Sequence, residues 1–184
     1  MTPQPVKPRV LIVDDRPANR LAFEMLLAPM YSVYIAGDGR EALELTRLMD
    51  FAVILLDVRM PGMDGFEVAE QLRKSERTAY TPIIFMSAYD RSDFHAKKGY
   101  VAGATDYIFS PVDEELLKYK VATYVQIFLR NEALWQQVTH LKETVRALEK
   151  QLSQVCRTEE IEREFRSLES QIEALKDQLD PLPR

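Results

Sequence analysis

The sequence contains the run Arg9-Val-Leu-Ile-Val-Asp-Asp15, in which an apolar segment leads directly into two carboxylates. A second apolar run, Phe51-Ala-Val-Ile-Leu-Leu56, is closed by Asp57 in the same way. Short runs rich in Val, Ile and Leu that stop at a charged residue are typical of parallel strands, which are covered on both faces and meet solvent at their carboxyl ends. Open α/β sheets keep their chemistry at that edge, so we expect Asp14, Asp15 and Asp57 to form one site.

Further strand-like runs predict the remainder of the sheet. Together with the two runs above, they occupy residues 10–13, 31–36, 51–56, 83–87 and 106–109, and segments with helical spacing separate them. Strands that alternate with helices in this way favour an α/β fold with a five-stranded, parallel, doubly wound sheet.

Short polar signals mark where helices begin. Asp38, Asp64 and Asp90 each precede a second acid by three residues, which is the pattern of an N-terminal helix cap. Pro17 suits the first turn of another helix. The Pro- and Gly-containing loop at residues 61–65 predicts a sharp turn of the backbone beside the carboxylates.

The composition excludes several classes of protein. A formal net charge of -5, without a block rich in Lys and Arg, argues against direct nucleic-acid binding. The single cysteine, Cys156, excludes an intrachain disulfide framework and favours a reducing compartment. No segment approaches the roughly 20 apolar residues of a membrane helix. We therefore expect a cytoplasmic protein without a membrane partner, with residues 1–8 as a disordered, proline-rich tail and residues 181–184 as a second tail.

The C-terminal third of the chain has a heptad pattern. Neither Gly nor Pro occurs between Val112 and Pro181, which predicts long helical structure. Apolar residues there step alternately by four and three, as in the seam of a coiled coil. The phase slips between Val155 and Ile161, where we expect the coil to be overwound, weak or bent. The seam residues are Leu134, Val138, Leu141, Val145, Leu148, Leu152, Val155, Ile161, Phe165, Leu168, Ile172, Leu175 and Leu179.

One rod cannot bury such a seam alone, so we predict that residues 126–180 form a coiled-coil signalling helix in a parallel homodimer. Two alternatives stay open: an antiparallel hairpin that folds back near residues 156–158, or packing of the helix onto the globular part. His140 lies next to the seam and is expected to be an exposed helical residue.

The three carboxylates suggest a specific chemistry. A hard divalent cation such as Mg²⁺ binds oxygen ligands and commonly links one or two carboxylates to a phosphate. With the metal present, Asp57 can attack phosphorus and form an aspartyl phosphate. Alternatively, Asp14 or Asp15 taken alone is an acid that caps the following helix.

Four fragments of the sequence are informative together: Asp14-Asp15, Asp57-Val-Arg-Met-Pro-Gly-Met-Asp-Gly65, Met86-Ser87-Ala88, and Gly103-Ala-Thr-Asp-Tyr107 continuing to Pro111. In this order and spacing they resemble the receiver domain of two-component response regulators. The resemblance covers residues 9–125 and implies a flavodoxin-like (βα)5 receiver fold. The segment 111–126 is similar to the last receiver helix of regulators and hybrid sensor kinases in which that helix continues into a coil.

The resemblance also implies roles for individual residues. Asp57 accepts phosphate from a phosphohistidine kinase or phosphotransfer protein. Mg²⁺ is held by Asp15, Asp57 and the backbone carbonyl of Arg59, with Asp14 acting through water. In addition, Ser87 occupies the position of the hydroxyl that binds the phosphoryl group, Tyr107 that of the aromatic switch residue, and Ala88 is small enough to let the donor enter.

Ser110 departs from the family pattern, which has a lysine directly before the proline. A hydroxyl cannot provide the long-reaching cation that pairs with phosphoryl oxygens, so phosphate sensing or its transmission is expected to be weaker. Arg16 or Arg59 is a candidate for partial substitution. The Ser110–Pro111 bond resembles the position at which receivers have a cis peptide.

The sequence therefore predicts a bacterial phosphoacceptor response regulator, not an enzyme beyond its own phosphotransfer and dephosphorylation, whose receiver state controls coiled-coil dimerisation or output. One alternative is a degenerate receiver that acts as a constitutive dimerisation scaffold. Another is an N-terminal fragment of a larger receiver-containing sensor kinase or cyclase. A nucleotide-binding enzyme is disfavoured because the turn Asp14-Asp-Arg-Pro17 lacks the glycines that approach a pyrophosphate.

Overall fold

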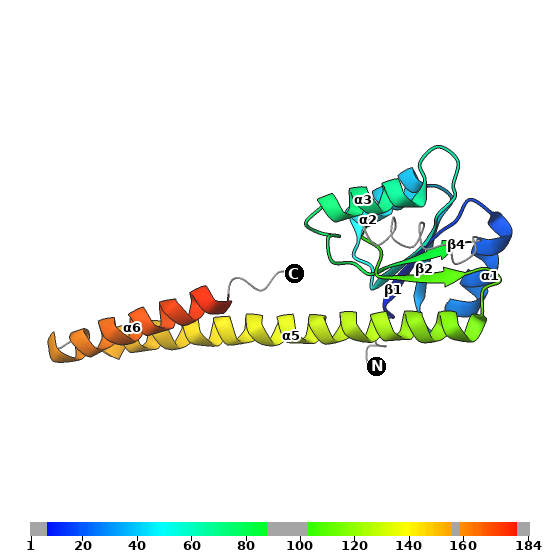
Figure 1. Cartoon of the computed structure of the whole chain (residues 1–184). Coiled ribbons are helices and arrows are strands. Elements are labelled where there is room, and N and C mark those ends of the chain that lie inside the picture. The colour runs from blue at the N-terminus through cyan, green and yellow to red at the C-terminus, as the bar shows by residue number, and fades with distance from the viewer. Residues whose placement is uncertain (1–6, 88–102, 156–158, 180–184) are drawn as a thin grey trace. The chain divides into compact units, whose positions relative to one another are not determined.

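The structure is a computed structural model, which describes residues 7–87, 103–155 and 159–179. The chain divides into two compact units, Met1–Leu129 and Arg130–Arg184. The first contains the sheet, and the described residues of the second are helical (Figure 1). The predicted helix start at Asp90 lies outside the described residues, as do Ala88 and Cys156.

The first unit is built on a five-stranded parallel sheet with the strand order β2-β1-β3-β4-β5. Each predicted strand is present, β4 and β5 with the expected ends and the other three with ends shifted by one or two residues, so the predicted fold class is confirmed. The strands are β1 (Arg9–Val13), β2 (Ser32–Ala36), β3 (Val53–Asp57), β4 (Ile83–Ser87) and β5 (Asp106–Phe109).

Helices cover both faces of this sheet, which explains why β1 from Val10 onward and β3 up to Leu56 are apolar and buried. On one face, Leu11 and Leu56 pack against α2 (Gly39–Leu48) and α3 (Gly65–Lys74). On the other, strand side chains pack against α1 (Pro17–Leu27) and the first turns of α5 (Glu114–Val155) (Figure 1).

The first turns of α5 belong to the receiver-like unit because their inner face is part of the core. Leu117, Val121 and Val125 are buried there, and Phe128 is partly buried against the same cluster. The unit continues to Leu129, slightly beyond the predicted boundary at residue 125.

Local signals place the helix starts as predicted. Asp64 accepts a hydrogen bond from the Glu67 N–H, and the Glu67 carboxylate accepts one from the Asp64 N–H, so α3 begins with a complete capping box. Asp38 caps α2 by accepting from two backbone N–H groups. Pro17 occupies the first turn of α1. These caps fix where each helix leaves the carboxyl edge of the sheet.

The second unit contains the remainder of α5 and the helix α6 (Glu159–Leu179). The described helices end at Val155 and resume at Glu159, where the heptad phase slips. Lys176 Nζ of α6 lies 2.9 Å from Glu149 Oε1 of α5. An ion pair of this kind within one chain is what the antiparallel hairpin predicts. The parallel dimer stays a prediction.

None of the helices in the described ranges combines the length and the apolar character needed to cross a bilayer.

Candidate functional site

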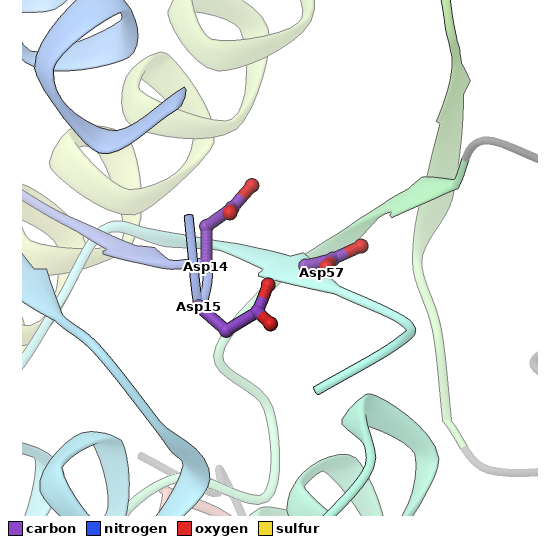
Figure 2. A group of neighbouring side chains, drawn as sticks. All are labelled: Asp14, Asp15 and Asp57. Carbon is purple, nitrogen blue, oxygen red and sulfur yellow. The ribbon is translucent and has the colours of Figure 1, made fainter. Parts of the chain in front are cut away.

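The candidate site lies where β1 and β3 end side by side. Val13 is paired with Leu56 in the ladder, so the residues that follow them, Asp14 and Asp57, emerge next to each other. In a sheet of this strand order, β1 and β3 flank the point where the order reverses, and ligands bind there. One carboxylate oxygen from each of Asp14, Asp15 and Asp57 lies within 4.8 Å of the others. Figure 2 shows the three side chains gathered in front of the strand ends.

Asp14 both lines the site and holds the start of α1. It is only 2% exposed. Its Oδ1 accepts from the Arg16 N–H at 2.8 Å, and its Oδ2 accepts from Asn19 Nδ2 at 2.9 Å. Asp14 is not the N-cap of α1, which is Arg16, but its carboxylate already has protein donors on both oxygens.

Asp15 has an oxygen that the protein does not satisfy. Its Oδ1 is buried, and no described residue donates a hydrogen bond to it. A buried acceptor without a hydrogen bond costs about 1–3 kcal/mol of stability, and a charged acceptor costs more. This oxygen is therefore suited to binding a ligand. A divalent cation fits the donor set of three carboxylates, since hard cations take oxygen ligands.

The closeness of the three carboxylates also changes the pKa of Asp57. Burial, followed by the negative charges of Asp14 and Asp15, raises the pKa of Asp57 from 3.8 to about 6. A backbone N–H from Arg59 and the positive charge of Arg16 oppose this rise in pKa. A bound cation would relieve the repulsion between the three carboxylates.

Gly65 allows the loop after β3 to close tightly against the site. A Cβ at this position would lie 2.3 Å from the Asp57 carbonyl oxygen. The Gly65 N–H donates to the Val58 carbonyl at 3.0 Å, and the Val58 N–H donates to the Met86 carbonyl at 3.1 Å. This close approach fixes the backbone on either side of Arg59, whose carbonyl is the predicted third ligand.

A cavity of about 40 Å³ opens in front of Asp57. It brings Ser87 and Ser110 together with the carboxylate, as the resemblance implies, and the Ser110 N–H donates to the Ser87 carbonyl at 2.8 Å. The Ser110–Pro111 bond is cis, which confirms that expectation. The lining residues are Asp14, Arg16, Asn19, Phe23, Asp57, Arg59, Met86, Ser87, Ser110 and Val112.

Tyr107 lies one layer away, on β5. Its ring is tilted against Phe85 with a centroid distance of 5.5 Å, and it is stacked with Phe109 at 6.1 Å. Tyr107 is partly buried against the core and is not one of the residues that line the cavity.

Two features of the site region were missed by the sequence reading. Asn19, which donates to Asp14, lies in the first turn of α1, close in sequence to the carboxylate it contacts. Lys120 Nζ of α5 lies 2.5 Å from Asp106 Oδ2, and the Tyr124 hydroxyl lies 3.4 Å from the same oxygen. No local pattern predicts this second group, because it depends on how α5 packs against β5.

Comparison with known proteins is consistent with this geometry. The family model described as the response regulator receiver domain matches residues 10–122. A Vibrio cholerae protein named as a probable cyclic di-GMP phosphodiesterase is 35% identical over 74% of this chain and 31% of its own length. Response regulator PleD of Caulobacter vibrioides is 38% identical over 70% of this chain and 28% of its own length. The chain thus spans about a third or less of these relatives.

Sensor kinases and solved receivers are also similar. Sensor histidine kinase GacS of Pseudomonas protegens is 34% identical over 68% of this chain and 14% of its own length. Chemotaxis protein CheY4 of Vibrio cholerae superposes with a TM-score of 0.62 at 32% identity, covering 65% of this chain and 99% of that one. The receiver domain of sensor histidine kinase PA1611 of Pseudomonas aeruginosa, solved with a magnesium ion coordinated in its active site cleft, has a TM-score of 0.61 at 25% identity, covering 66% and 99%.

Proposed function

The chain belongs to the response regulator receiver family, and on that premise we propose that Asp57 is the phosphoacceptor of a bacterial two-component phosphorelay. One observation carries the proposal: Asp14, Asp15 and Asp57 converge at the carboxyl ends of β1 and β3, and a buried Asp15 oxygen has no donor among the described residues.

The proposed reaction transfers a phosphoryl group from a phosphohistidine to Asp57. A carboxylate oxygen of Asp57 forms a bond to phosphorus, the bond from phosphorus to the imidazole nitrogen breaks, and the imidazole leaves with the electron pair and takes up a proton. A pKa of about 6 leaves Asp57 mostly ionised at neutral pH, as a nucleophile requires.

Asp15, Asp57 and the Arg59 carbonyl would hold Mg²⁺, with Asp14 acting through water. When bound, the metal supplies positive charge opposite the transferring phosphoryl oxygens. The magnesium in the cleft of the similar PA1611 receiver supports this assignment.

The residues around the cavity take the remaining roles. The Ser87 hydroxyl would bind a phosphoryl oxygen, and Tyr107 would respond to that contact from its place beside Phe85. Ala88 lies outside the described residues, and the resemblance alone suggests that it would leave room for the donor. Ser110, which stands beside Ser87, supplies no cation.

The proposed partner is a histidine kinase or phosphotransfer protein in the cytoplasm, and similarity to sensor kinases such as GacS supports a place in this class of pathway. The output is a second copy of the chain joined through the coil, or a further domain of a longer protein, as the lengths of the relatives suggest. The receiver itself catalyses only its own phosphotransfer and dephosphorylation.

The test is intact-mass spectrometry after incubation with acetyl phosphate and Mg²⁺. We expect one phosphoryl group on the wild-type chain, none when Mg²⁺ is chelated before acetyl phosphate is added, and none on Asp57→Asn. Asp64→Asn is the matched control, because Asn also caps a helix and Asp64 does not line the cavity. Absence of the adduct on the wild-type chain, or an equal adduct on Asp57→Asn, would refute the proposal.

A second candidate function is a scaffold that dimerises whatever the state of Asp57. Ser110 in place of a cation motivates it, and so do seam leucines that stay exposed in the single chain, such as Leu141 at 51% and Leu148 at 52%. An assembly state that never depends on phosphorylation would favour this function.

A further inference from the structure

A phosphoryl group at this site needs more positive charge than a metal alone provides. An acyl phosphate carries about two negative charges at neutral pH, and Asp14 and Asp15 add two more carboxylates beside it. One divalent cation neutralises only about half of that total, so a side-chain cation that reaches the cavity would strengthen phosphoryl binding.

Two cationic side chains, Arg16 and Arg59, are among the described residues that line the cavity. Two further cations among the described residues of this unit are already bound elsewhere. Arg20 donates to the Asp14 carbonyl at 2.6 Å, and Lys120 is paired with Asp106 at 2.5 Å.

Arg16 is held through its backbone, and no described residue accepts a hydrogen bond from its side chain. Its N–H donates to Asp14 Oδ1 at 2.8 Å, its backbone is extended just before α1, and Pro17 follows. The residue is exposed, and its guanidinium makes no hydrogen bond or ion pair with another described residue. The side chain can therefore turn towards the cavity without breaking an existing contact.

Arg16 is favoured over Arg59 by the contacts that each already makes. Among the described residues, Arg16 donates only through its backbone N–H, to Asp14, whereas Arg59 already takes part in an interaction with the surrounding protein. Arg59 lies in the loop after β3, and its own backbone carbonyl is the predicted metal ligand.

Resting on the proposed function, we infer that the Arg16 guanidinium binds the phosphoryl oxygens on Asp57 and supplies the cation that Ser110 lacks. Its planar fork of N–H donors suits two phosphoryl oxygens at once. Arg16 is thus proposed as a phosphoryl-binding residue, and it comes from the start of α1 instead of the end of β5.

The experiment measures the affinity of beryllofluoride, a phosphoryl analogue, by calorimetry in the presence of Mg²⁺. We expect Arg16→Ala to weaken binding about tenfold, as for loss of a charge-assisted hydrogen bond. Arg40→Ala, which removes an exposed arginine of α2 remote from the cavity lining, should bind like wild type. In a Ser110→Lys background, Arg16→Ala should change the affinity by less than about twofold, because a second cation is then present.

Thermal unfolding without beryllofluoride checks that each variant is folded. Unchanged affinity of Arg16→Ala would overturn the inference, as would an equal loss in both backgrounds or a loss confined to Arg59→Ala. These results leave the phosphoacceptor proposal intact as long as wild type binds beryllofluoride. Failure of wild type to bind beryllofluoride would overturn both.

Discussion

Asp57 combines partial burial, two neighbouring negative charges and the proposed role of phosphoacceptor. Its carboxyl closes β3, and burial together with Asp14 and Asp15 raises its pKa to about 6. In the unfolded chain the same group titrates near 3.8. Between these two values the folded protein retains a proton that the unfolded chain has lost. The stability contributed by the protonated carboxyl is present below pH 3.8 and is lost as the pH rises through 6.

We therefore predict that Asp57→Asn stabilises the metal-free protein at about pH 8 by about 1–3 kcal/mol, and that this gain disappears towards about pH 4. The neutral amide removes the repulsion that the ionised carboxylate suffers above its pKa. Urea unfolding at several pH values measures the difference. Asp38→Asn, an exposed cap, should show no such dependence, and a stability difference between Asp57→Asn and wild type that is flat with pH would contradict the account.

Individual residues also show what sequence reasoning can find at a site. Asp14, Asp15 and Asp57 were predictable because each follows an apolar run, and the carboxyl ends of neighbouring parallel strands share an edge. The difference in hydrogen bonding between Asp14 and Asp15 was not predictable. Both Asp14 oxygens accept hydrogen bonds, whereas one buried Asp15 oxygen has no donor among the described residues. That difference depends on where the Arg16 N–H and the Asn19 amide lie after α1 has packed.

The contact of α3 with β3 depends on one missing side chain. At Gly65, the first residue of α3, a Cβ would lie 2.3 Å from the Asp57 carbonyl oxygen and 3.0 Å from Val58 Cα. Both neighbours are backbone atoms of the sheet and its exit, which cannot give way as a flexible side chain can. The helix would have to move and take the loop around Arg59 with it.

Gly65→Ala is thus predicted to cost about 1–3 kcal/mol of stability, as overpacking does, and to weaken Mg²⁺ binding. Gly37→Ala is the matched control, because the nearest atom to its added Cβ lies at an ordinary 3.6 Å. Denaturant unfolding gives the cost for each variant. Equal, small effects of the two substitutions would mean that α3 is free to shift.

The strands and helix caps were predictable because their signals are local. β4 and β5 begin and end where the apolar runs do, and Asp64 caps α3 through residues adjacent in sequence. The ion pair between Asp106 of β5 and Lys120 of α5 was not predictable from the sequence, because it forms only where these two elements pack together. It ties the strand of Tyr107 to the helix that leaves the receiver.

The chain as a whole combines a receiver with helices that bury little of their own seam. Several seam leucines are about half exposed, and the phase slip coincides with the interval between α5 and α6. The Lys176–Glu149 ion pair shows that α6 can contact α5 of the same chain. Sequence could not decide between a hairpin and a dimer, because both bury the same stripe.

Sedimentation of wild type against Leu141→Lys/Leu148→Lys separates these arrangements. If the seam pairs two chains, wild type should be dimeric and the double variant monomeric, because lysines in the seam would be buried without partners. Leu48→Lys, an exposed residue of α2, should leave the dimer unchanged. Beryllofluoride with Mg²⁺ should shift the dimer affinity in wild type and not in Asp57→Asn. A monomeric wild type would support the hairpin.

The central claim is that carboxylates at the open edge of the sheet hold a magnesium ion, and calorimetric titration with Mg²⁺ tests it most directly. The account predicts uptake of one ion in the millimolar range by wild type and by Asp38→Asn, and a large loss of affinity in Asp15→Asn, whose orphaned oxygen is the proposed ligand. No detectable uptake by wild type, or equal uptake by Asp15→Asn, would contradict it.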